Sequence, residues 1–179
     1  MKKAFFFDRD GIVNVKLEND YVKSIDEFVF TEGFFDFFKL IKEKNYIAIL
    51  VTNQQCIAKN IINTDTLAAI HTYMQEELLK HSGYNFDDVY YCPDLDGTNS
   101  INRKPAIGMF TDAIKKHSID ARSSWTIGDS NTDIEAGSKA GTKTIYVNKI
   151  KNVKGMQPNL CFNNLAEVYE YFINLWEFK

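Results

Sequence analysis

The stretch Ala4-Phe5-Phe6-Phe7-Asp8-Arg9-Asp10-Gly11 places four apolar residues directly before two carboxylates and a glycine. Four residues are too few for a helix, and aromatic side chains favour a buried β-strand. A signal peptide needs about 7–15 apolar residues and a membrane span about 20, whereas Asp8 ends this run after four residues. The stretch therefore predicts a buried strand with acidic groups at its carboxyl end.

Short apolar runs and helical patterns alternate along the rest of the chain. The runs are rich in β-branched or aromatic residues and predict strands at residues 4–7, 47–51, 89–91, 125–127 and 144–147. Apolar residues at three- and four-residue spacing predict helices at residues 34–44, 64–82, 107–117, 131–140 and 164–176. This order is typical of a three-layer α/β/α sandwich around a mostly parallel, Rossmann-like sheet.

Residues 11–30 interrupt the alternation. Their Tyr21-Val22 and Phe28-Val29-Phe30 stretches predict a short β-hairpin that projects from the end of the first strand. We find no linker long enough to separate two folding units, and 179 residues are typical of one domain. We therefore expect a single domain over residues 1–179.

Composition restricts the classes of function. The chain has 21 basic and 24 acidic side chains and a formal net charge of −3, whereas nucleic-acid binders usually carry a strongly basic face. Its three cysteines, Cys56, Cys92 and Cys161, form no CxxC pair, so we expect no disulfide framework. We expect a soluble cytoplasmic protein with no membrane or nucleic-acid partner, as a monomer or a dimer.

Polar residues follow several predicted strands at their carboxyl ends, where ligands gather in parallel sheets. One such residue alone is more often a helix cap or a solvated loop charge. Several carboxylates and a lysine at one sheet edge would require a cation among them. The candidate residues are Asp8, Asp10, Thr52, Asn53, Gln54, Arg103, Lys104, Asp129 and Asp133.

Four segments resemble the signatures of the haloacid dehalogenase-like hydrolase superfamily, in the expected order and across essentially the whole chain. They are Phe5-Phe6-Phe7-Asp8-Arg9-Asp10-Gly11, Val51-Thr52-Asn53, Lys104-Pro105 and Gly128-Asp129-Ser130-Asn131-Thr132-Asp133. Residues 20–33 and Arg103-Lys104-Pro105 further resemble one branch of that superfamily. The branch contains the D-glycero-D-manno-heptose 1,7-bisphosphate 7-phosphatases and the histidinol-phosphate phosphatases.

The resemblance implies a capless, Mg²⁺-dependent phosphatase that hydrolyses a phosphorylated sugar through an aspartyl-phosphate intermediate. It implies that Asp8 is the nucleophile and Asp10 the general acid and base. It further implies that Thr52 and Lys104 bind the phosphoryl group and that Asn53, Gln54 and Arg103 contact the substrate. Mg²⁺ would be held by Asp8, Asp129 and the main-chain carbonyl of Asp10, and Asp133 would lie behind these ligands.

Elementary electrostatics agrees with these roles. A carboxylate about 4 Å from a phosphate of charge near −2 is repelled by roughly 8 kcal/mol at an effective dielectric constant of 20, which Mg²⁺ and Lys104 would offset. Asp10 must be protonated to act as an acid, although an unshifted carboxyl has a pKa of about 3.9. We expect Asp8 and the incoming phosphate to raise the pKa of Asp10.

The chain departs from the family pattern in two places. Ile12 stands where the first signature usually has Thr. The branch typically carries a zinc loop of three cysteines and a histidine, whereas this chain has only Cys92 in the corresponding segment, so zinc is not expected. The intervals after the first and third strands also leave no room for a cap domain. We therefore expect an open site, roofed by residues 11–30 and 92–102.

Several activities remain open from the sequence. The 7-phosphate of a heptose bisphosphate is the leading substrate, and histidinol phosphate is the alternative within the branch. Loss of Asp8, Asp10, Lys104 or Asp129 would favour a catalytically silent binding protein, and all four residues are present. The excess of acidic over basic side chains disfavours a nucleic-acid 3′-phosphatase. A dehalogenase is disfavoured because its leaving group would not need Asp10 as an acid.

Overall fold

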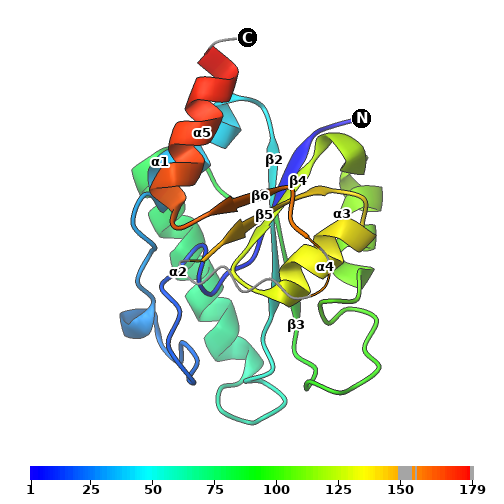
Figure 1. Cartoon of the computed structure of the whole chain (residues 1–179). Coiled ribbons are helices and arrows are strands. Elements are labelled where there is room, and N and C mark those ends of the chain that lie inside the picture. Colours follow the sequence, from blue (N-terminus) through cyan, green and yellow to red (C-terminus); the bar gives the residue numbers. More distant parts are fainter. Residues whose placement is uncertain (149–154, 156, 178–179) are drawn as a thin grey trace.

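The computed structural model describes residues 1–148, 155 and 157–177. Within these residues, six strands form one parallel sheet in the order β3-β2-β1-β4-β5-β6 (Figure 1). The strands are β1 (Ala4–Phe7), β2 (Ile47–Asn53), β3 (Asp88–Cys92), β4 (Trp125–Gly128), β5 (Lys143–Val147) and β6 (Leu160–Phe162).

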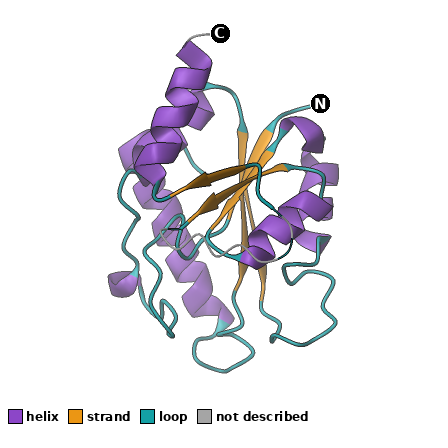
Figure 2. Cartoon of the chain, in the orientation of Figure 1, coloured by secondary structure: helices purple, strands orange, loops and turns teal. Residues whose placement is uncertain are grey.

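Helices cover both faces of the sheet (Figure 2). On one face lie α1 (Phe34–Glu43), α2 (Thr64–Ser82) and α5 (Leu165–Glu177), and on the other α3 (Gly108–His117) and α4 (Asn131–Lys139). The predicted three-layer architecture is confirmed, and every helix and strand predicted outside residues 11–30 is present with its ends within two residues of the expected ones. The sequence analysis missed the short edge strand β6.

Strand β1 is buried throughout and divides the core into two layers. Phe5 points toward α1 and α5, where its ring centroid lies 5.7 Å from that of Phe37 and 5.4 Å from that of Phe172. Phe6 points the opposite way and lies 4.9 Å from the ring of Phe110 on α3. Burying one such side chain stabilises the fold by about 1.5–3 kcal/mol, so both layers fix the position of β1.

The predicted hairpin in residues 11–30 is wrong. Asn14 and Phe30 form only an isolated antiparallel bridge, and a single 3-10 turn, η1 (Ile25–Glu27), lies between them. Val22 and Phe28 are both buried in the core, and the ring of Phe28 packs on Tyr73 of α2. These contacts with the core fold the segment onto the protein and leave no pair of strands.

The connections that follow β1 and β3 are irregular. Residues 8–33 and 93–107 are described in full, and apart from η1 and isolated bridges they contain only turns and loops. Neither connection holds a cap domain, as the sequence predicts. In the described part of the chain, no helix combines the length and apolarity needed to cross a membrane.

Candidate active site

The candidate site lies at the carboxyl edge of the sheet, where the strand order changes direction. From β1 the chain adds β2 and β3 on one side and then places β4 on the other side of β1. Asp8 and Asp129 follow the adjacent strands β1 and β4, and Asp8 N–H donates to Ile127 O at 3.0 Å. Such a switch point is the usual ligand site of an open parallel sheet.

Three acidic side chains converge there. One carboxylate oxygen from each of Asp8, Asp129 and Asp133 lies within 4.8 Å of the other two. Burial and the negative charge of Asp133 raise the pKa of Asp8 to about 7, against the lowering effect of Lys104. Burial and Asp133 also raise the pKa of Asp129. Bringing these carboxylates together therefore costs free energy unless a positive charge joins them.

The donor set fits a magnesium ion. Asp129 Oδ1 is buried and has no hydrogen-bond partner among the described residues. A buried carboxylate oxygen without a partner is costly, and carboxylate oxygens are the ligands that Mg²⁺ prefers. We therefore consider Asp8 and Asp129 suitable to hold Mg²⁺.

Two glycines permit this close approach. Gly11 has a φ of +98°, and a Cβ there would overlap Oδ2 of Asp129. A Cβ on Gly128 would overlap the side chain of Asp133. Any larger residue at either position would push a carboxylate out of the cluster.

Lys104 supplies a buried positive charge beside the cluster. Its Nζ lies 2.8 Å from Asp8 Oδ1, 2.6 Å from Asp133 Oδ1 and 2.7 Å from Val51 O. Burial lowers its pKa, but Asp133 and Asp8 outweigh that effect and raise the pKa above the ordinary value. Asn53 holds the Lys104 backbone, accepting from its N–H at 3.0 Å and donating to its carbonyl at 3.1 Å. Lys104 is therefore a fixed ammonium ion.

Asp133 serves the helix as well as the lysine. Its Oδ2 accepts a hydrogen bond from the backbone N–H of Ser130, as part of a capping box at the start of α4, and another from the Ser130 hydroxyl. Because Lys104 engages the other oxygen, both oxygens of Asp133 already have partners. This arrangement agrees with a position behind the metal ligands.

Asp10 lies in a cage of hydrogen-bond donors. Its Oδ1 accepts from Arg9 Nη2 and Asn14 Nδ2, each at 3.0 Å, and its Oδ2 accepts from Arg9 Nη2 at 3.0 Å and Gln54 Nε2 at 2.8 Å. Burial raises the pKa of Asp10, but Arg9, Asn14 and Gln54 together outweigh burial, and the net shift is downward. The expected rise is therefore not found, because these donors favour the carboxylate.

Only some of the residues predicted to contact phosphate or substrate line the cavity. Asn53 lines the cavity beside Asp8. Thr52 and Gln54 are buried, and Gln54 donates to Thr52 Oγ1 at 2.9 Å as well as to Asp10. Arg103 donates to Asp94 O at 3.1 Å. Thr52, Gln54 and Arg103 do not line the cavity.

The cavity has a volume of about 250 Å³ and opens over the acidic cluster. Some of the residues that line it are predicted site residues. The loop after β1 contributes five further residues, Lys16, Leu17, Asp20, Tyr21 and Val22. The sequence analysis singled out neither Lys16 nor the buried Arg9 as a site residue. The position of Arg9 between Asp8 and Asp10 could have indicated that Arg9 belongs to the site, whereas no sequence motif indicates Lys16.

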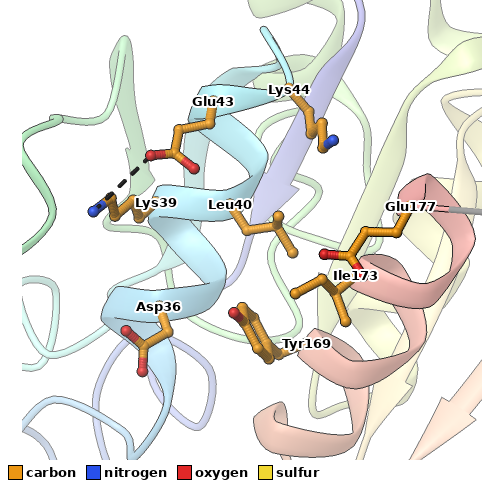
Figure 3. Close-up of a pocket in the computed structure, with 8 residues that line it drawn as sticks. All are labelled: Asp36, Lys39, Leu40, Glu43, Lys44, Tyr169, Ile173 and Glu177. Carbon is orange, nitrogen blue, oxygen red and sulfur yellow. Dashed lines mark ion pairs between the residues drawn. The ribbon is translucent and has the colours of Figure 1, made fainter.

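A larger groove lies elsewhere, between α1 and α5 (Figure 3). It measures about 440 Å³, and Leu40, Tyr169 and Ile173 line it together with charged side chains. One of its charged pairs joins Lys39 and Glu43, 4.0 Å apart. No residue from the carboxyl ends of the strands lines this groove, so cavity size alone does not locate the chemistry.

The two departures from the family pattern are also visible. Ile12 is completely buried in the apolar core. Cys92 is buried at the end of β3, where its Sγ lies 3.4 Å from Asp94 Oδ2 and 3.5 Å from Ser100 Oγ. The Cys92 thiol therefore contacts two polar side chains of the segment that follows β3.

Comparison with known proteins agrees with the geometry. A family model described as HAD-hydrolase-like matches residues 101–168. The chain is 34% identical to a D-glycero-beta-D-manno-heptose-1,7-bisphosphate 7-phosphatase of Haemophilus ducreyi over 180 residues, covering 95% of this chain and 98% of the relative. It is 33% identical to a D-glycero-alpha-D-manno-heptose-1,7-bisphosphate 7-phosphatase of Campylobacter jejuni over 171 residues, covering 95% of each.

A solved structure is similar over nearly the whole chain. It is the D,D-heptose 1,7-bisphosphate phosphatase from B. bronchiseptica complexed with magnesium and phosphate, with a TM-score of 0.86 and 28% sequence identity. The match covers 96% of this chain and 98% of that one.

Proposed function

The chain belongs to the haloacid dehalogenase-like hydrolases, in the family of the heptose bisphosphate phosphatases, and from this premise we propose that it removes the 7-phosphate of D-glycero-D-manno-heptose 1,7-bisphosphate. The observation that carries the proposal is the convergence of Asp8, Asp129 and Lys104 at one edge of the sheet. This arrangement offers a nucleophilic carboxylate, a set of magnesium ligands and a fixed ammonium ion within one small cavity.

In the first half-reaction, an oxygen of Asp8 attacks the phosphorus atom. The bond between phosphorus and the sugar oxygen breaks, and Asp10 gives its proton to the leaving alkoxide. Mg²⁺ held by Asp8, Asp129 and the main-chain carbonyl of Asp10 would supply the charge that offsets the repulsion between nucleophile and phosphate. Lys104 adds a second positive charge beside Asp8, which favours the ionised, nucleophilic form of that carboxylate.

In the second half-reaction, water attacks the aspartyl phosphate and Asp10 accepts its proton. Inorganic phosphate leaves, and Asp8 regains its carboxylate. The donors around Asp10 favour its ionised form, which is the form this second step requires. In the first step, the negative charge of the bound phosphate would favour the protonated form of Asp10.

The proposal extends to the whole chain and its surroundings. We propose one domain over residues 1–179, although residues 149–154, 156, 178 and 179 lie outside the described part. We further propose a cytoplasmic protein, a monomer or a dimer, that needs Mg²⁺ and no zinc and binds neither nucleic acid nor membrane. Elemental analysis that found one zinc per chain would contradict the cofactor assignment.

A phosphate-release assay tests the substrate. The purified protein would be offered both anomers of the heptose bisphosphate, histidinol phosphate and a 3′-phosphorylated oligonucleotide, each with and without Mg²⁺. We expect Mg²⁺-dependent release from the heptose bisphosphate at least tenfold faster than from the others. Preferential hydrolysis of histidinol phosphate or of the oligonucleotide would overturn the proposal.

A further inference from the structure

Lys16 forms an ion pair that the reaction described above does not use. Its Nζ lies 2.7 Å from Oδ2 of Asp129, and its side chain is 53% exposed, whereas that of Asp129 is 10% exposed. The positive charges of the cavity lining, among the described residues, are Lys16 and Lys104. Because Lys104 is buried between Asp8 and Asp133, Lys16 alone of these two lysines has room to move.

The backbone that carries Lys16 is anchored. The Val15 N–H donates to Val29 O at 2.8 Å, and Asn14 Nδ2 donates to Val15 O at 2.9 Å and to Asp10 Oδ1 at 3.0 Å. The loop therefore delivers the ammonium of Lys16 to one side of the acidic cluster. A lysine stem of four rotatable carbons lets that ammonium swing while the backbone stays in place.

The same carboxylate is required by the magnesium ion. Asp129 is one of the residues suited to hold the ion, and Lys16 neutralises one of its two oxygens. An ammonium ion and a divalent cation at one carboxylate repel each other, so binding of one weakens binding of the other. Lys16 and the divalent cation are thus competitors for Asp129.

The charge of the cavity suggests where the displaced ammonium goes. Five aspartates line the cavity, at positions 8, 10, 20, 129 and 133, against the two lysines. A sugar with two phosphates brings further negative charge into the cavity. Lys104 already contacts Asp8 and Asp133, so its charge is not available to a second phosphate. A phosphate that is not cleaved would be repelled by these carboxylates unless a cation, such as the displaced ammonium of Lys16, lies beside it.

We propose that Lys16 is a specificity-determining residue: it competes with the divalent cation for Asp129 and, once displaced, binds the phosphate of the substrate that is not cleaved. The second half of this statement rests on the proposed function, because it requires a substrate with two phosphates. The first half concerns only the protein and the metal.

Titration with Mn²⁺, followed by electron paramagnetic resonance without substrate, tests the competition. An exposed ion pair contributes little free energy, so we expect Lys16→Met to bind Mn²⁺ about two- to fivefold more tightly than the wild type. Lys16→Arg keeps the charge and should stay near the wild type. Lys139→Met removes a similarly exposed lysine, paired with Glu135 on α4, and serves as the matched control. Unchanged or weaker Mn²⁺ binding in Lys16→Met would overturn the proposal.

Steady-state kinetics at saturating Mg²⁺ tests the substrate contact. We expect the ratio of kcat/KM for the heptose bisphosphate to kcat/KM for the heptose 7-phosphate to fall about tenfold in Lys16→Met, as for the loss of one charged hydrogen bond. An unchanged ratio would show that Lys16 does not bind the second phosphate. If the wild type hydrolyses neither sugar, the proposed function fails, while the Mn²⁺ titration still decides whether Lys16 competes for Asp129.

Discussion

The guanidinium of Arg9 and the imidazole of His71 face each other at 3.4 Å, from Nη1 to Nε2. Arg9 is completely buried and His71 is 8% exposed. Burial and the positive charge of Arg9 lower the pKa of His71 to about 4, against a raising effect of Asp10. The ring of Tyr91 also packs against His71. A neutral histidine on α2 thus supports the arginine that holds Asp10.

This pair predicts how stability depends on pH. An ordinary histidine has a pKa near 6.5, so between pH 6.5 and 4 the unfolded chain binds a proton at residue 71 that the folded protein excludes. The free energy of unfolding should therefore fall by about 3 kcal/mol as the pH drops through that window. Urea denaturation at pH 7, 5.5 and 4 measures the slope. His71→Gln should reduce the slope, whereas His81→Gln, an exposed position on the same helix, should not; equal slopes in all three proteins would contradict the prediction.

Substitution of the two acidic residues of the first signature should separate their roles. Asp8→Asn removes the nucleophile and should abolish phosphate release. Asp10→Asn keeps the nucleophile but loses proton transfer, so both half-reactions should slow by about 10²–10⁴-fold. Rapid quenching with radiolabelled substrate would detect the phosphorylated enzyme in wild type and not in Asp8→Asn. Activity of Asp8→Asn close to that of the wild type would exclude Asp8 as the nucleophile.

Replacing Gln54 tests whether it touches substrate or only positions Asp10. Gln54→Leu removes the hydrogen bonds to Asp10 and Thr52 and should lower the free energy of unfolding by about 1–3 kcal/mol. We expect kcat to fall about tenfold with KM within twofold of the wild type, because the side chain is buried behind the cavity. Gln75→Leu, which loses hydrogen bonds to the Phe86 backbone, should lower stability without changing kcat. A large rise in KM for Gln54→Leu would instead indicate that Gln54 contacts the substrate.

Gly11 offers a test of the acidic cluster. In Gly11→Ala the new methyl group would displace Asp129, so Mn²⁺ affinity should fall at least tenfold by isothermal titration calorimetry. Gly97→Ala is the matched control, because Gly97 also has a positive φ, of +80°, yet no atom within 4 Å of the new Cβ. That control should lose about 1 kcal/mol of stability through backbone strain and keep its Mn²⁺ affinity. Equal affinities in both variants would argue against Asp129 as a ligand.

The sequence predicts the sheet well because local patterns decide it. Residues 4–7 can bury four apolar side chains only as a strand, and the polar residues that follow must then lie at the sheet edge. The same local logic fails for residues 11–30, since Val22 and Phe28 are placed by contacts with the distant helix α2. It also misses β6, a three-residue edge strand in which Cys161 is exposed and Leu160 and Phe162 are only partly buried.

The sequence predicts that three aspartates and Lys104 meet at one edge of the sheet, but it does not predict the direction in which the other polar side chains point. The motif around Gln54 does not tell whether its amide faces the cavity or Asp10. A buried arginine needs partners for its charge and its N–H groups. Arg9 has Asp10 beside it in the sequence, but its other partner, His71, lies on the distant helix α2 and could not be predicted from a local pattern. Lys16 reaches Asp129 across 113 positions of the sequence, which no local pattern encodes.

Strand β1 is hydrogen-bonded to β2 on one side and to β4 on the other, so Asp8 is attached to one of the last segments to open in native-state fluctuations. Lys16 and Tyr21, by contrast, belong to a loop that carries no strand pairing of its own beyond isolated bridges. Substitutions in this loop can therefore change the lining of the cavity, while Asp8 keeps the protection of the sheet interior.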